Sequence, residues 1–308
     1  MRKNTLMILC TLAVACAAGL AWISYGGHAS SNHARRTRAT DLRNDSDRNL
    51  QLSDPPSASA ISRAAGPSTP RERFEQSRDL FALVQGLRAA ADGGDAAAQT
   101  LIADAYLECI GVALDPAYRN PGVAPAEEGH PQLKRYVGSL LAIHRERCGR
   151  LESQDVGGLQ AIRTLYANAA KNGSSKALAM QLMYNPDLDA VPDAELAADV
   201  EQIKNSGDPD AIGALSNLMG SRAESRDVVF GTASGTEMDE YAWLLAACEM
   251  GMECGPDSAV VRGYCLNGGI CDANSVDRII ASDKLSASDY RMTLALSRQI
   301  VSNIEGQH

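Results

Sequence analysis

Apolar residues recur every three or four positions along much of the chain after residue 69, which is the spacing of a buried helix face. Three such faces consist of the following positions: Ala98, Leu101, Ile102, Ala105 and Cys109; Ala211, Leu215, Leu218 and Met219; and Tyr290, Leu294, Ser297, Val301 and Ile304. A further helix is predicted near residues 132–148, and Ser286 with Asp289 is expected to cap the last helix. The pattern predicts an all-α fold.

The helical region has a defined predicted start. Thr69 is followed by Pro70 and Glu72, which is the sequence signature of a helix that opens with a capping box. Residues 30–68 are rich in Ser, Arg, Asp, Asn and Pro, lack apolar periodicity, and are predicted to form a disordered linker. We therefore expect a helical domain over residues 69–308.

Four turns between predicted helices share one pattern, in which a small-residue helix end is followed by Gly, a polar cap and a second apolar helix. The turns lie at residues 89–95, 169–174, 203–209 and 246–251. Gly favours the left-handed conformation that ends a helix. The residues expected to begin the next helix are Asp95, Ser174 and Asp208 as caps, with Pro209 at a first helical position.

The first copy, AAADGGDAAAQTLIADAY from Ala89 to Tyr106, resembles the Sel-one-like repeat, a relative of the tetratricopeptide repeat (TPR). The copy from Ala169 to Leu182, AAKNGSSKALAMQL, is similar. The resemblance implies an α-solenoid of helix-turn-helix repeats that presents a surface to a protein partner, and it implies no catalytic residues.

The spacing of the copies departs from the family. The turn glycines Gly94, Gly173, Gly207 and Gly251 are 79, 34 and 44 residues apart, whereas repeats of this kind run to about 36 residues. We therefore expect degenerate copies with a long loop at residues 110–131. An irregular helical bundle with accidental Gly turns is the alternative.

The N-terminus predicts export. Arg2 and Lys3 precede a 20-residue apolar run over residues 6–25, long enough for a signal anchor, while the small residues up to Ala29 suit signal-peptide cleavage. A lipobox at Cys16 is a weaker match. Each interpretation of residues 1–29 places residues 30–308 in the periplasm or outside the cell, possibly anchored to the inner membrane.

Charge is unevenly distributed along the chain. Residues 1–70 contain 8 of the 29 Lys and Arg and 4 of the 38 Asp and Glu, which leaves 21 and 34, a net −13, for residues 71–308. An acidic domain argues against nucleic acid as a partner, because phosphate binding needs clustered cations. The basic residues 35–38 follow the apolar run, where they suit contact with anionic lipid or a solvated linker.

Beyond Cys10 and Cys16, the exported part contains six cysteines, an even number that indicates disulfides in an oxidising compartment. Six cysteines permit fifteen connectivities. Two pairs flank Gly turns with five residues between them, and the third follows by elimination. The predicted bridges are Cys109–Cys148, Cys248–Cys254 and Cys265–Cys271. Zinc is the competing interpretation, although structural zinc sites prefer two to four residues between paired cysteines.

Motifs for catalysis are missing from the sequence. It contains no Gly-x-Ser-x-Gly elbow, phosphate-binding loop, His-Glu-x-x-His or dinucleotide fingerprint. His130 is expected in a loop and His144 on a solvated helix face. Trp243 with Tyr241 is expected in the core, and anchoring of a partner is the alternative for this pair. We predict no catalytic residue, no cofactor and no metal ligand.

Two classes of function remain open from the sequence. The first is a protein-binding or scaffold module of the cell envelope without defined catalytic activity. The second is a cell-envelope hydrolase with an unrecognised site on a helical fold. The low aromatic content, 5% of residues, argues against a sugar-binding cleft.

Overall fold

A computed structural model describes residues 69–306 except 115–130, 225, 227–229, 232, 269 and 272. The chain divides into residues 1–61 and 62–308, and every described residue belongs to the second unit. The predictions for the N-terminal apolar run, the linker, Cys10, Cys16 and His130 therefore lie outside the described residues.

Every secondary-structure element among the described residues is a helix and none is a strand, which confirms the all-α prediction. The longer helices are α2 (Pro70–Gln76), α3 (Leu80–Asp92), α4 (Ala96–Leu114), α6 (Pro131–Cys148), α8 (Gly158–Lys171), α9 (Ser175–Met183), α10 (Asp193–Asn205), α11 (Pro209–Met219), α13 (Glu237–Glu249), α14 (Ala259–Gly268) and α16 (Ala287–Glu305). The short ones are α7 (Ser153–Val156), η1 (Leu188–Ala190), η2 (Ser221–Ala223), α15 (Val276–Ile279) and the π-helical turn η3 (Ile280–Lys284).

Three of the four predicted turns join two helices as expected. Gly94, Gly173 and Gly207 have positive φ angles of 89°, 101° and 62°, a conformation that favours glycine. The cap that follows each of them accepts a backbone hydrogen bond from the next helix: Asp95 from Ala98, Ser174 from Ala177, and Asp208 from Asp210. These turns fold α3 onto α4, α8 onto α9 and α10 onto α11.

The fourth turn departs from the prediction. Gly251 also has a positive φ, 113°, but no helix follows it directly. Residues 252–258 form a loop, and α14 begins only after Ser258, whose Oγ accepts the backbone N–H of Val261. The Cys248–Cys254 bridge closes this loop.

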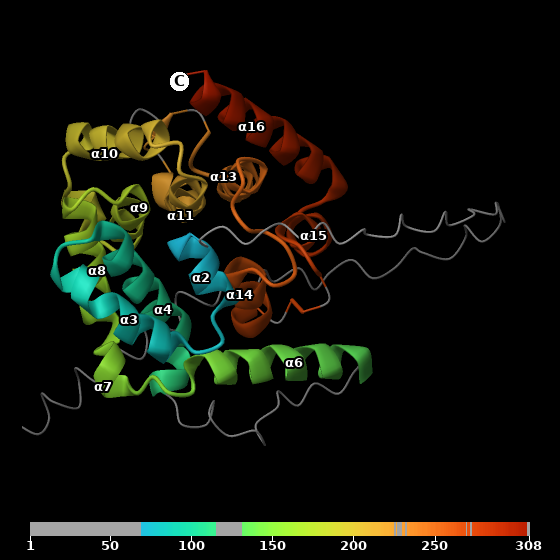
Figure 1. The fold of residues 1–308 in the computed structure, drawn as a ribbon. Helices are drawn as coiled ribbons and strands as arrows, with labels where there is room; N and C mark the ends of the chain where they lie inside the picture. The colour runs from blue at the N-terminus through green and yellow to red at the C-terminus, as the bar shows by residue number, and fades with distance from the viewer. Residues whose placement is uncertain are drawn as a thin grey trace, which may run out of the picture. The chain divides into compact units, whose positions relative to one another are not determined.

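The helices pack in chain order. Contacts run from α3 to α4, α8, α9, α11, α13 and α16 in succession (Figure 1). The side chains form two apolar clusters, one centred on α3, α4 and α8 and the other on α11, α13 and α16. Helix α9 contributes to both, with Ala177 and Met180 in the first and Ala179 and Leu182 in the second. It thus joins the two halves.

The predicted buried faces of α4 and α11 are confirmed, since every listed position on them is buried. On α16, Ser297, Val301 and Ile304 are buried, whereas Tyr290 and Leu294 are half-buried. The predicted loop at 110–131 was wrong at its start, because α4 continues to Leu114 and buries Val112 and Ala113. Helix α4 is apolar and long enough to cross a membrane, but most of it is buried here.

Candidate functional site

The short helix α2 lies among the other helices, between α4, α11 and α14 (Figure 1). Its predicted capping box is confirmed: Glu72 N–H donates to Thr69 Oγ1 at 3.1 Å, and Thr69 N–H donates to Glu72 Oε2 at 2.7 Å. Phe74 is its one buried side chain. We call the six charged residues around it the α2-binding surface: Asp104 and Glu108 from α4, Arg147 from α6, Lys176 from α9, Asp210 from α11 and Arg262 from α14.

One end of the α2-binding surface is acidic and holds Arg71. The Arg71 guanidinium lies 2.6 Å from Glu75 in its own helix, 3.3 Å from Asp210 and 3.7 Å from Asp104. Burial alone would lower the pKa of Arg71, but Asp210, Glu75 and Asp104 outweigh that effect and raise it. The guanidinium is therefore held by carboxylates from three different helices.

Asp104 is the deepest acid at this end. Its Oδ1 accepts the Tyr166 hydroxyl at 2.8 Å, and its Oδ2 lies 2.5 Å from Lys176 Nζ. Burial, followed by the charge of Asp104, raises the pKa of Tyr166 well above its ordinary value. Tyr166 therefore keeps its proton and donates a hydrogen bond to Asp104, and Asp104 links α4, α8 and α9 beneath α2.

The other end is basic and holds the last turn of α2. The Arg147 guanidinium forms two parallel bonds to Glu108, at 2.7 and 2.9 Å. Its Nη1 also donates to the carbonyls of Phe74, Glu75 and Ser77. The carbonyls that end a helix lack intrahelical partners, so Arg147 satisfies the end of α2.

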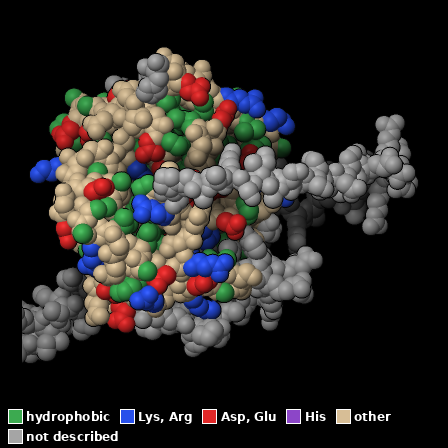
Figure 2. All heavy atoms as spheres, viewed as in Figure 1, with side chains coloured by type: hydrophobic (Ala, Val, Ile, Leu, Met, Phe, Trp, Pro, Cys, Tyr) green, Lys and Arg blue, Asp and Glu red, His purple; other side chains and the backbone are tan. Residues whose placement is uncertain are grey.

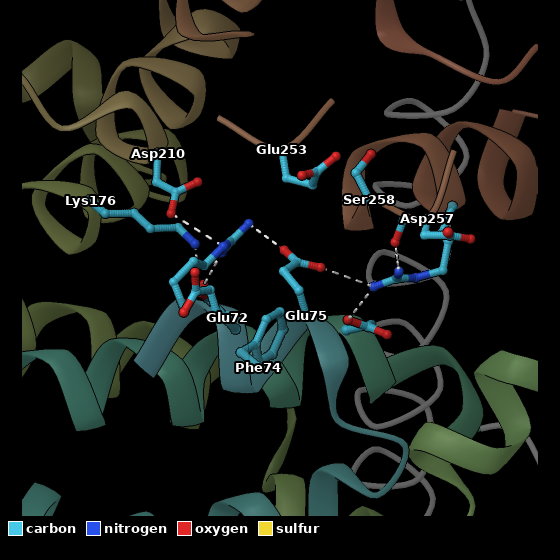
Figure 3. Close-up of polar contacts among 12 residues, drawn as sticks. Glu72, Phe74, Glu75, Lys176, Asp210, Glu253, Asp257 and Ser258 are labelled. Atoms are coloured by element: carbon cyan, nitrogen blue, oxygen red, sulfur yellow. Dashed lines mark hydrogen bonds and ion pairs between the residues drawn. The ribbon is translucent and has the colours of Figure 1, made fainter. Parts of the chain in front are cut away.

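Arg262 and Phe74 complete the contact. Arg262 Nη2 lies 3.4 Å from Glu108 and 3.6 Å from Glu75, so that Glu75 stands between two guanidiniums (Figure 3). The Phe74 ring lies 5.5 Å from the Arg71 guanidinium and 5.4 Å from that of Arg147, within the range of cation–π attraction. Burial would raise the pKa of Glu108, but Arg147 and Arg262 lower it on balance.

The three predicted disulfides are present: Cys109–Cys148, Cys248–Cys254 and Cys265–Cys271. The first is directly linked to the α2-binding surface, because Cys109 follows Glu108 in α4 and Cys148 follows Arg147 in α6. The bridge thus fixes the two helices whose side chains form the Arg147–Glu108 pair.

The prediction of a solvated His144 was wrong. His144 is 8% exposed, and its Nδ1 lies 3.9 Å from Cys148 Sγ because α6 turns this face toward α4. Burial, assisted by Arg262 and Arg147, lowers its pKa against the pull of Glu108. His144, Glu108 and Cys148 lie near one another as metal ligands would, but the Cys148 sulfur is bonded to Cys109 and offers no thiolate.

A second titratable group lies between α11, α13 and η3. Glu240 of α13 packs against Gly220, where an added Cβ would come within 2.6 Å of its Oε2. Burial, followed by the charge of Glu237, raises the pKa of Glu240 to about 7, while Lys284 opposes the shift. Nearby, Lys284 Nζ lies 5.8 Å from the Tyr264 ring, and the pKa of Tyr264 is raised to about 12. In the sequence, Glu240 follows Asp239 as one of two acids at a helix start, a pattern that predicts no titration near neutral pH.

The core role predicted for Trp243 and Tyr241 is confirmed. Trp243 is 3% exposed and its Nε1 donates to the Ala233 carbonyl at 2.7 Å, while the Tyr241 hydroxyl donates to Glu237. The α2-binding surface was not predicted from the sequence. Its available signals were Asp104 and Glu108, two acids inside the apolar run of α4 that demand buried partners.

Comparisons with known proteins give no relative: no family model, no curated protein and no solved structure matches this chain.

The Cys109–Cys148 disulfide is expected to stabilise the fold more than the Cys248–Cys254 disulfide. Replacing Cys109 and Cys148 together by Ser should lower the free energy of unfolding by about 4 kcal/mol, because the bridge closes a 40-residue loop in the unfolded chain. The matched Cys248→Ser/Cys254→Ser variant opens a seven-residue loop, for which about 2.4 kcal/mol is expected. Urea unfolding of the two variants measures both losses, and a larger loss from the short bridge would contradict the account.

Glu240 is expected to make stability fall as pH rises. Its folded pKa, about 7, exceeds the ordinary value of 4.5, so stability is complete below pH 4.5 and is lost as pH passes through 7. Glu240→Gln should unfold like wild type at pH 4 and be more stable by about 1–2 kcal/mol at pH 8, after allowance for partial exposure. Urea unfolding between pH 4 and 8 measures the stability of both proteins. A free-energy difference between them that stays constant with pH would refute the raised pKa of Glu240.

Proposed function

We propose that this chain is an exported helical-repeat protein, Sel-one-like or TPR-like with degenerate copies, that binds a polypeptide partner in the cell envelope. The observation that supports it best is the arrangement of α4, α9 and α11. These are the second helices of three helix pairs, and each directs a charged side chain to one surface, namely Asp104, Lys176 and Asp210. A stack of helix pairs that lines one surface in this way is the means by which helical solenoids bind other chains.

The compartment is part of the proposal. Three disulfides are typical of an oxidising, extracytoplasmic environment. With residues 1–29 as signal peptide or anchor and residues 30–68 as tether, the domain would act in the periplasm, possibly held at the inner membrane.

A protein is the favoured class of partner. Figure 2 shows acidic and basic side chains interspersed over the viewed face, without a broad cationic area among its coloured residues. Mixed charge of this kind suits complementary ion pairs with another protein. It does not suit a polyphosphate backbone, which needs clustered cations.

Glu240 supports the second candidate, a cell-envelope hydrolase. A carboxyl group with a pKa near 7 is suited to general-acid chemistry at neutral pH. The partner-binding proposal is preferred because it accounts for six charged residues from five helices, whereas the hydrolase rests on one carboxyl group.

Site-specific crosslinking tests the proposed function. A photoreactive side chain would replace Asp257, which is exposed and whose carbonyl accepts from Arg262 of the α2-binding surface, or Glu201, which is exposed on α10, a helix that contributes no residue to that surface. Irradiation in the native envelope should join one defined polypeptide to position 257 and leave position 201 unreacted, as mass spectrometry would show. Equal capture from both positions would contradict the proposal. Turnover of peptidoglycan fragments that Glu240→Gln abolishes would establish the hydrolase instead.

A further inference from the structure

Helix α2 is bound to the rest of the domain as a ligand is bound to a receptor. Although α3 follows it after only three residues, α2 packs chiefly against α4. Its interactions are made by three side chains, Arg71, Phe74 and Glu75, and by the carbonyls of its last turn. The partners of these groups come from α4, α6, α11 and α14, all distant in sequence.

The surface beneath α2 is complementary to it in charge and in order along the helix. Asp104 and Asp210 receive Arg71 in the first turn, and Arg262 receives Glu75 one turn later. Arg147 then binds the terminal carbonyls. Figure 3 shows Asp210 and Glu75 at successive positions along this line. Phe74, 2% exposed, occupies the apolar part between the two charged ends.

The contact between α2 and the surface is weak enough for another helix to replace α2. Phe74 is the one side chain of α2 that is buried, so a single apolar side chain supplies the hydrophobic part of the contact. The Arg71 side chain retains 28% exposure, and ion pairs that remain in contact with solvent contribute little to stability. The Arg147–Glu108 pair and its bridge to Arg262 join α6, α4 and α14 to one another, so they persist when α2 leaves.

We infer that the α2-binding surface is a receptor for a short helix with Arg in its first turn, an aromatic residue three positions later and a carboxylate four positions later. Helix α2 occupies this receptor within the chain until a partner helix of the same chemistry replaces it. The inference rests on the proposed function, and it names the chemistry by which the partner is recognised.

Binding of a separate α2 peptide to the full-length oxidised protein tests the inference. The probe is a fluorescein-labelled peptide of residues 69–79, TPRERFEQSRD, followed by fluorescence anisotropy. The Arg71→Ala/Phe74→Ala protein has a weakened helix and should bind the probe at least tenfold more tightly than wild type, whose own α2 competes at a high effective concentration. The matched peptide with Ala at both positions should bind the variant at least tenfold more weakly.

Two further variants make the test decisive. In the first, Asp210→Asn is added to the Arg71→Ala/Phe74→Ala protein. It removes a partner of the probe's Arg71 without changing α2 itself, and it should weaken probe binding at least threefold. Arg71→Glu keeps Phe74 in place, and it should bind the probe more tightly than wild type even if loss of Phe74 prevents folding. Two results would show that α2 is a fixed part of the fold. One is equal probe binding by wild type, Arg71→Ala/Phe74→Ala and Arg71→Glu; the other is equal binding of the probe and of the peptide with Ala at both positions. The proposed function would survive that result if position 257 still captured a partner.

Discussion

The structure around α2 depends on one constraint, which is that charges removed from water must meet opposite charges. Asp104 and Arg147 are 8% and 3% exposed, and an isolated charge at such depth would cost several kcal/mol. Asp104 meets this demand through Lys176 and Arg71, and Arg147 meets it through Glu108. Because the partners lie on different helices, satisfying the charges also sets how α4, α6, α9 and α2 are placed.

The disulfides and the charge network act on the same helices. The Cys109–Cys148 bond joins α4 to α6 one residue away from the Glu108–Arg147 pair. It holds the two ends of the pair in register, so that the Arg147 fork can also reach the carbonyls of α2. The other two bridges close short loops that begin in α13 and in α14.

Local signals in the sequence predicted much of the fold. The Thr69 capping box, the turns at Gly94, Gly173 and Gly207 and the disulfide pairing all depend on residues near one another in the chain or on simple elimination. The fourth turn failed because a disulfide-closed loop follows Gly251 in place of a helix. The repeat identity and the anchor remain predictions.

The candidate site could not be predicted in the same way. Arg71, Asp104 and Asp210 are separated by up to 139 positions in sequence, and their proximity arises only when α2, α4 and α11 pack. The prediction for His144 failed for the same reason, since the nearby Arg145 and Arg147 suggested a solvated face, whereas α6 turns His144 and Arg147 toward α4. Glu240 resembled an ordinary acid in a first helical turn until Gly220 and the end of α11 buried it.

The central claim is that α2 is held on this surface by charge, and hydrogen exchange at the backbone amides of Arg73 to Ser77 tests it most directly. In the full-length protein these amides should be protected. Arg147→Lys, which keeps the charge but removes the fork that binds the α2 carbonyls, should speed their exchange about tenfold while the amides of α9 are unchanged. Exchange of α2 at the rate of an unstructured peptide in the wild-type protein, or at the same protected rate in both proteins, would contradict the account.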